Sequence, residues 1–282
     1  MAGRRISHPI SLAREWKDIF LRVYRGISED RILLVAAGVT FYALLSIFPG
    51  IAALISIYGV FADSGTMADQ LDTVVNVAPG GAIQVLRDEM TRLASRGGTT
   101  LGVGFIVSLV ISLWTTNSGV SAIFDALNIV YREKEKRGFL RYYTETLTFT
   151  IGAVLFVLVS IAVVVLLPVV LNYIPLPEGA DFIVKIARWP VILVLAALAL
   201  AALYHYGPSR REPRWRWITW GSVFAAILWL AASVLFSWYV ANFGSYNKTY
   251  GSLGAVVGFM TWIWISIIVV LVGAKLDAEI EH

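Results

Sequence analysis

The sequence predicts an all-α, polytopic membrane protein with six transmembrane helices, an N-terminal amphipathic helix and an external interfacial helix. Six apolar stretches each have the roughly 20 residues that a helix needs to cross a hydrocarbon core. The chain is 58% hydrophobic, only 15% charged, and has a mean hydropathy of +0.73. Seventeen of its 23 Lys and Arg residues lie before the first stretch, in the second and fourth loops, or at the end of the sixth. Because Lys and Arg mark the cytoplasmic side, this alternation predicts an even number of spans and two cytoplasmic termini.

We expect one transmembrane domain over residues 1–282, with a cytoplasmic amphipathic segment at 1–31. In that segment apolar side chains recur at helical spacing between basic ones: Leu12, Trp16, Ile19, Phe20, Val23 and Ile27. Such a helix lies in the membrane interface, and packing against other cytoplasmic loops is the alternative. The spans are expected at about residues 32–61, 101–123, 147–170, 186–204, 217–240 and 253–274.

The first span contains Pro49 near its middle, and a proline inside a helix removes a backbone hydrogen bond and bends the helix. The loop after this span, at about 62–100, is the longest external one. Pro79 suits a helix start, and apolar residues then recur at helical spacing. We therefore expect a helix at about 79–95 on the external surface.

The second span has a polar face and leads to a pair of charges. The face consists of Asn117, Ser121, Asp125 and Asn128. Polar groups at this depth are costly unless they face protein or water. Two interpretations remain open: a structural network of hydrogen bonds between helices, or a solute path. Lys275 and Asp277 follow the last span, and Lys275 lies at a depth similar to that of Asp125, which suggests an ion pair between Asp125 and Lys275. The alternative is that Lys275 reaches lipid phosphates while Asp125 caps nearby backbone.

The last span begins with a glycine pair and follows a polar turn. Gly254 and Gly258 form a G-x-x-x-G motif, which favours close helix packing. The turn before it carries side chains that could hold a sugar-like or zwitterionic group, but the residue pattern favours a simple hydrogen-bonded hairpin loop. The residues concerned are Asn242, Tyr246, Asn247 and Tyr250.

Composition argues against several classes of protein. There is no cysteine, and the three histidines, His8, His205 and His282, lie in separate segments without acidic partners at metal-ligand spacing. No nucleotide-binding or nucleophile motif is present. We therefore expect no metal, no cofactor and no enzymatic activity. The net charge of +4 comes from basic residues that flank spans, so the expected partners are the bilayer and its anionic lipids rather than nucleic acid.

Several motifs, in order, resemble the YihY/BrkB family of bacterial membrane proteins. The first span carries Ala36-Ala37-Gly38-Val39-Thr40-Phe41-Tyr42-Ala43-Leu44-Leu45-Ser46-Ile47-Phe48-Pro49. The second carries Trp114-Thr115-Thr116-Asn117-Ser118-Gly119, followed by Ala126-Leu127-Asn128-Ile129-Val130-Tyr131. Tyr206-Gly207-Pro208 and Pro213-Arg214-Trp215-Arg216-Trp217 match the fourth loop, and Thr249-Tyr250-Gly251-Ser252-Leu253-Gly254 and Gly273-Ala274-Lys275-Leu276-Asp277-Ala278-Glu279 match the last span. The resemblance covers about residues 20–282. Lys275 departs from it, because the family more often has an acidic residue there, and Asp277 stands where asparagine is usual.

The resemblance implies a six-span protein of the bacterial inner membrane. The family was formerly labelled ribonuclease BN, but the scattered histidines argue against a metal-dependent nuclease. We expect a transporter or a lipid- or solute-handling protein, and a non-transporting envelope scaffold is the alternative. The sequence leaves open whether the protein forms a homo-oligomer.

Overall fold

The computed structural model describes residues 12–61, 103–172, 180–210, 219–243 and 252–281. These ranges form seven helices and no strand, which confirms the predicted all-α class for the described part of the chain. The helices are α1 (Leu12–Glu29), α2 (Ile32–Phe61), α5 (Val103–Val130), α6 (Phe139–Asn172), α7 (Ala180–Tyr206), α8 (Trp220–Phe243) and α10 (Ser252–Glu281).

Two helices of the described part are candidate membrane spans by length and apolar composition, Trp220–Val240 and Val256–Glu281. A third candidate is the bent pair formed by Trp16–Glu29 and Ile32–Ile47. These candidates overlap three of the six predicted spans. The protein therefore has the long apolar helices of a membrane protein.

A sharp corner separates α1 from α2. The two helix axes differ by 62°, and Arg31 between them has a φ of 51°. A left-handed residue ends one helix and lets the chain leave in a new direction. Pro49, in contrast, lies inside the continuous helix α2. The main change of direction near the first predicted span is therefore at Arg31.

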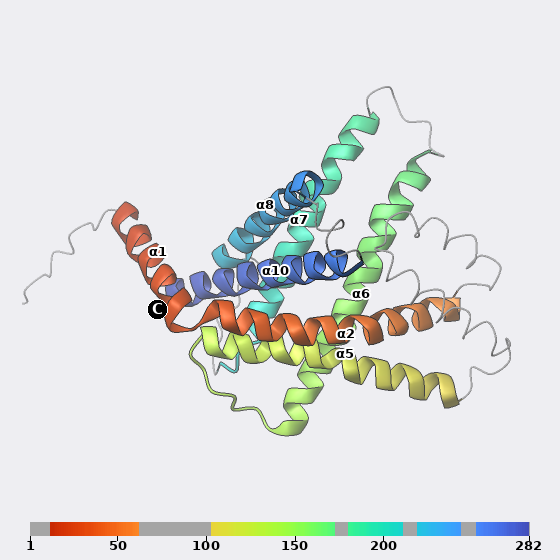
Figure 1. The fold of residues 1–282 in the computed structure, drawn as a ribbon, viewed down its shortest axis with the longest axis horizontal. Coiled ribbons are helices and arrows are strands. Elements are labelled where there is room, and N and C mark those ends of the chain that lie inside the picture. Colours follow the sequence, from red (N-terminus) through yellow and green to blue (C-terminus); the bar gives the residue numbers. More distant parts are fainter. Residues whose placement is uncertain (1–11, 62–102, 173–179, 211–218, 244–251, 282) are drawn as a thin grey trace, which may run out of the picture.

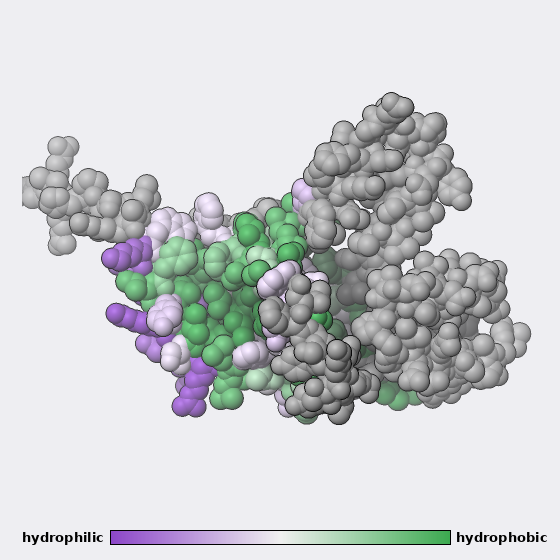
Figure 2. Space-filling model, turned by 45° about the horizontal axis from the view of Figure 1, so that its top comes forward, coloured by the Kyte–Doolittle hydropathy of each residue, from purple (hydrophilic) through white to green (hydrophobic). Residues whose placement is uncertain are grey.

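The charged side chains gather at one end of the helix bundle. This end, called the charged end below, comprises the α1–α2 corner, residues 131–139, the chain around Tyr206–Arg210 and the last turns of α10. Figure 1 shows that α1 and the C-terminus lie there, on the left of the view. In Figure 2 hydrophilic residues gather at the same side, and hydrophobic residues cover the adjoining surface.

The buried core lies next to the charged end. It contains Ile32 and Ala36 of α2, Leu127 of α5, Tyr204 of α7 and Leu271 of α10, together with their neighbours. Farther along the helices many apolar side chains are exposed, among them Val110, Ile111, Leu155, Val159, Val234, Leu235 and Val257. Figure 1 shows α6 and α7 running away from α2 and α5 with distance from the charged end. The helices are thus packed most tightly where their charged termini meet.

The glycine prediction for the last span is wrong at Gly258. A Cβ added there would meet no atom of the described residues within 4 Å, so this glycine makes no close helix contact within that part of the chain. Close contacts occur instead at Gly119 of α5, where a Cβ would come within 2.8 Å of Ser46 Oγ on α2. The packing of Gly254 and the predicted external helix at 79–95 lie outside the described residues.

Candidate functional site

Asn117, the deepest residue of the predicted polar face, is bonded to a neighbouring helix. Its side chain is 2% exposed, and the Thr150 hydroxyl of α6 donates to its Oδ1 at 3.0 Å. Its amide group lies 3.5 Å from Ser121 Oγ, one turn along α5. Because a buried amide in an apolar surrounding must be satisfied by protein groups, this arrangement matches the structural interpretation of the polar face.

The two other residues of the face serve different contacts. Asp125 is exposed and accepts a hydrogen bond from Tyr142 at 3.0 Å. Asn128 is buried, donates to Glu135 Oε2 at 2.9 Å and accepts from the Ser209 backbone at 2.7 Å. The face therefore divides into an α5–α6 contact and an anchor for two loops at the charged end.

Arg137 is the centre of the charged end on this side of the bundle. Its side chain is only 7% exposed and forms ion pairs with Glu135 and Glu145, both at 2.7 Å. It also donates to the carbonyl groups of Tyr206 and Gly207, at 3.2 and 2.9 Å. The guanidinium lies over the rings of Phe124 and Tyr142, 5.3 and 5.4 Å from their centroids. One side chain thus joins the ends of α5, α6 and α7.

Sequence reasoning missed Arg137 as a functional residue, because it counted Arg137 only as a cytoplasmic charge. A signal was available in the two acidic residues near it, Glu135 and Glu145. Its partners at Tyr206 and Gly207 are backbone carbonyl groups some 70 residues away, and no side-chain pattern identifies those.

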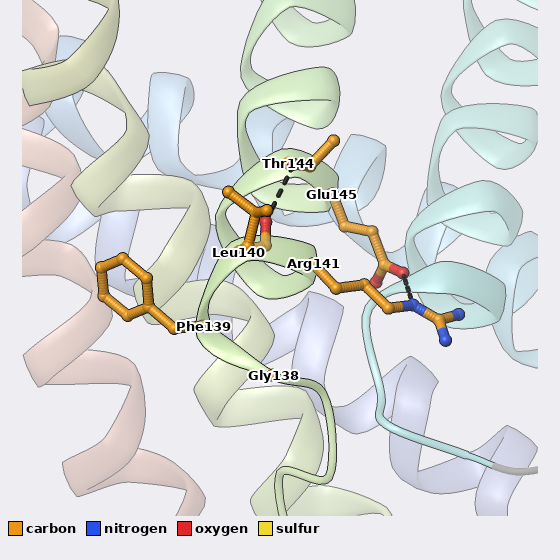
Figure 3. A pocket seen from close by; sticks show the side chains of 6 residues that line it. All are labelled: Gly138, Phe139, Leu140, Arg141, Thr144 and Glu145. Carbon is orange, nitrogen blue, oxygen red and sulfur yellow. Dashed lines mark hydrogen bonds and ion pairs between the residues drawn. The ribbon is translucent and has the colours of Figure 1, made fainter.

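An open hollow lies at the start of α6, beside Arg137. Its lining residues are Gly138, Phe139, Leu140, Arg141, Thr144 and Glu145. Figure 3 shows Phe139 pointing away from the other side chains, while Arg141 donates to Glu145 at 2.8 Å. Thr144 donates to the Leu140 carbonyl at 2.8 Å. The polar groups of the hollow are therefore already bonded to one another.

Glu135 gives the charged end a specific acid sensitivity. Burial alone would raise the pKa of Glu135, but hydrogen bonds from Arg137 and Asn128 outweigh it and hold the pKa at about 2. Because this value is below the ordinary 4.5 of glutamate, the stabilisation is complete above pH 4.5 and is lost as the pH falls toward 2.

We expect Glu135→Gln to remove this part of the pH dependence. Thermal unfolding of wild type and variant, measured between pH 7 and pH 3, should show a difference in melting temperature that shrinks as the pH falls. Glu133→Gln is the matched control, since Glu133 pairs with Lys136, whose side chain is 48% exposed and well solvated. A constant difference for Glu135→Gln across the pH range would contradict the assignment.

Lys275 occupies the other half of the charged end and does not pair with Asp125. Its side chain is 2% exposed, and its Nζ lies 2.8 Å from Asp30 Oδ2 and 3.3 Å from Glu279 Oε1. Glu279 also pairs with Arg22 of α1, at 2.9 Å. The predicted Asp125–Lys275 pair is wrong, because the α1–α2 corner brings Asp30 to Lys275 while Asp125 faces Tyr142 of α6.

Gly26 makes room for the Lys275 side chain. A Cβ added to Gly26 would overlap Lys275 Cε and lie 3.1 Å from its Nζ. The lysine stem therefore crosses α1 at the one residue that lacks a side chain, and its charge reaches Asp30 beyond it. This contact fixes α1 against α10.

Asp277 bonds to the start of another helix. Its Oδ1 accepts the backbone N–H of Gly221, at the N-terminus of α8, at 2.7 Å. Helix N-termini favour carboxylates because their first N–H groups lack partners within the helix.

Three atoms nearby are buried and have no hydrogen-bond partner among the described residues: Asp277 Oδ2, Tyr131 Oη and Arg210 Nε. Arg210 lies over the Tyr131 ring at 4.4 Å and pairs with Glu281.

Two further predictions concern other chemistry. No group of three His, Asp or Glu side chains able to hold a metal ion occurs in the part of the chain that the structure describes. The predicted external site falls largely outside it: Tyr246, Asn247 and Tyr250 are not described, and Asn242 lies in the last turn of α8.

Comparison with known proteins finds relatives over most of the chain. The family profile described as Virulence factor BrkB matches residues 23–282. The chain is 29% identical to YfkH of Bacillus subtilis, named as a ribonuclease-like protein, with 93% of each chain covered. It is 26% identical to the UPF0761 membrane protein IL2447 of Idiomarina loihiensis, with 95% of each covered. It is 28% identical to the UPF0761 membrane protein VSAL_I2938 of Aliivibrio salmonicida, over 96% of this chain and 85% of that one. No solved structure matches.

Proposed function

Because the chain belongs to the Virulence factor BrkB family, and several of its curated relatives are named as membrane proteins, we propose that it is a lipid-handling protein of the bacterial inner membrane. It binds lipid acyl chains along the far halves of its helices and moves lipid between the two leaflets. It needs no metal or cofactor and is not an enzyme.

The proposed topology has six spans and two cytoplasmic termini. Helices α2, α5, α6, α7, α8 and α10 have 24 to 34 residues each, which is 36 Å or more at about 1.5 Å per residue. This length supports a crossing of a hydrocarbon core of roughly 30 Å by each. The charged end then faces the cytoplasm, in line with the distribution of Lys and Arg.

One observation carries the choice of lipid over a hydrated solute. The four residues of the predicted polar face of α5 are bonded to protein groups, as the Asn117–Thr150 bond illustrates, which argues against a hydrated path along this face. Many exposed side chains of the far halves are apolar, among them Ile111 of α5, Val159 of α6 and Leu235 of α8, with exposed fractions from 55 to 65%. Such surfaces match acyl chains better than a water-soluble substrate.

Lipid movement in proteoliposomes tests the proposal. Vesicles containing a fluorescent phospholipid are treated with a membrane-impermeant quencher, and the protein should allow quenching beyond the half that protein-free vesicles show. Leu235→Gln should slow the movement, because it places an amide on the lipid-contacting surface. Leu140→Gln, at a side chain 80% exposed beside the charged end, is the control and should leave the rate unchanged.

The same experiment separates the second candidate, a non-transporting envelope scaffold. The buried, hydrogen-bonded Asn117 favours a scaffold, because a rigid contact between helices requires no moving parts. Correctly folded protein that leaves quenching at the protein-free level would reject lipid movement and favour the scaffold.

A further inference from the structure

Helix α1 has two apolar faces, and only one of them packs on the protein. The packed face includes Val23, which is 6% exposed, and Gly26, which contacts the Lys275 stem. At its beginning Trp16 meets Trp220 of α8 edge to face at 6.0 Å. The second face carries Phe20, Leu21 and Tyr24, which are 48, 44 and 75% exposed.

Basic residues without partners surround this second face. Lys17, Arg25 and Arg31 are exposed and make no ion pair with any residue in the described ranges. The neighbouring basic and acidic residues are occupied: Arg22 pairs with Glu279, and Glu29 pairs with Arg132 at 2.7 Å. The exposed face therefore combines apolar side chains with unneutralised positive charge, although Asp18 lies beside it.

The corner at Arg31 sets the direction of this face. If α2 crosses the bilayer, a bend of 62° brings α1 closer to the membrane plane than to its normal. Leu33 and Leu34, directly after the corner, are 51 and 66% exposed. The exposed apolar surface of α1 is thus continued by the exposed start of α2.

We propose that the outer face of α1, formed by Lys17, Phe20, Leu21, Tyr24 and Arg25, docks on the anionic lipid headgroups of the adjoining leaflet. The apolar side chains enter the boundary between headgroups and acyl chains, and the basic groups contact lipid phosphates. The proposal rests on the proposed crossing of the bilayer by α2, but not on lipid movement. Each basic residue near an anionic surface contributes to binding and becomes ineffective at high salt.

The absence of cysteine from the sequence makes a direct test possible. Tyr24→Cys and Asp18→Cys are each labelled with a nitroxide in the full-length protein, which is reconstituted in phosphatidylcholine with or without phosphatidylglycerol. With phosphatidylglycerol, the label at 24 should be accessible to oxygen and protected from a water-soluble nickel complex, and the label at 18 should show the reverse. Protection at 24 should be lost in pure phosphatidylcholine, and also when Lys17→Gln and Arg25→Gln are introduced together.

Each outcome decides the proposal. A label at 24 that is accessible to the nickel complex in both lipids would overturn docking itself. A label equally protected in both lipids would overturn the anionic preference. Neither result depends on whether lipid moves between leaflets, so failure here is distinguishable from failure of the proposed function.

Discussion

Replacing Lys275 by methionine is expected to destabilise the protein by about 3 kcal/mol, because it leaves a buried carboxylate without its counter-charge. Asp30 is 8% exposed, and its remaining cation, Arg132, lies 3.5 Å from its Oδ1 with a side chain 61% exposed. Glu279 would lose the same partner. Methionine has nearly the volume of lysine, so the change removes charge rather than packing. Thermal or denaturant unfolding of the reconstituted protein measures the loss.

Two variants separate the ion pair from general damage. Asp30→Asn in the Lys275→Met background should recover part of the stability, since the buried carboxylate is then gone. Lys136→Met removes an exposed lysine that pairs with Glu133 at 2.6 Å, and it should cost less than about 1 kcal/mol. Equal losses of stability for Lys275→Met and Lys136→Met would show that the buried ion pair stabilises the protein no more than the exposed one.

Gly221→Ala should be the second severe change, with a loss of about 3 kcal/mol from overpacking. A Cβ at Gly221 would overlap the carbonyl oxygen of Gly273 and lie 2.6 Å from Asp277 Cγ. The first obstacle is backbone, so α8 and α10 must separate, and the hydrogen bond from Gly221 to Asp277 is strained at the same time.

Gly258→Ala provides a matched control for Gly221→Ala. A Cβ at Gly258 meets no atom within 4 Å among the residues that the structure describes, so this variant should be neutral or gain up to about 1 kcal/mol from the better helix propensity of alanine. Melting temperatures of the two variants in the same lipid decide the matter. A Gly221→Ala protein as stable as Gly258→Ala would mean that α8 and α10 can separate enough to accommodate the added Cβ at little energetic cost.

The sequence predicted the helices well because long apolar stretches and turn residues are local signals. The first span was predicted at 32–61, which coincides with α2. The last span was predicted to end at 274, whereas helix α10 continues to Glu281. The additional segment, about two turns at 3.6 residues per turn, contains Lys275, Asp277 and Glu279, whose charges lower its hydropathy. Their tertiary partners keep them in the helix, and hydropathy contains no information about those partners.

The partners of buried charges were the part that could not be predicted. The family resemblance marked Lys275 as unusual, and depth along the helices suggested Asp125 as its partner. The choice of Asp30 depends on the 62° corner and on the free space at Gly26, which are properties of the assembled structure. Likewise a close contact between α8 and α10 lies at Gly221 and Gly273 rather than at Gly258, because helix orientation decides which glycine faces a neighbour.

The pair between Asp30 and Lys275 also bears on how the protein is made. Synthesis runs from the N-terminus, so Asp30 is inserted at the membrane long before its partner exists, and Arg137 likewise precedes Tyr206 and Gly207. Until α10 has been made, the α1–α2 corner has an unneutralised carboxylate and an empty place at Gly26. A chain interrupted before Lys275 therefore exposes both defects to the proteases that survey the membrane, whereas a finished chain hides them. The buried ion pair thus distinguishes a completed chain from an incomplete one.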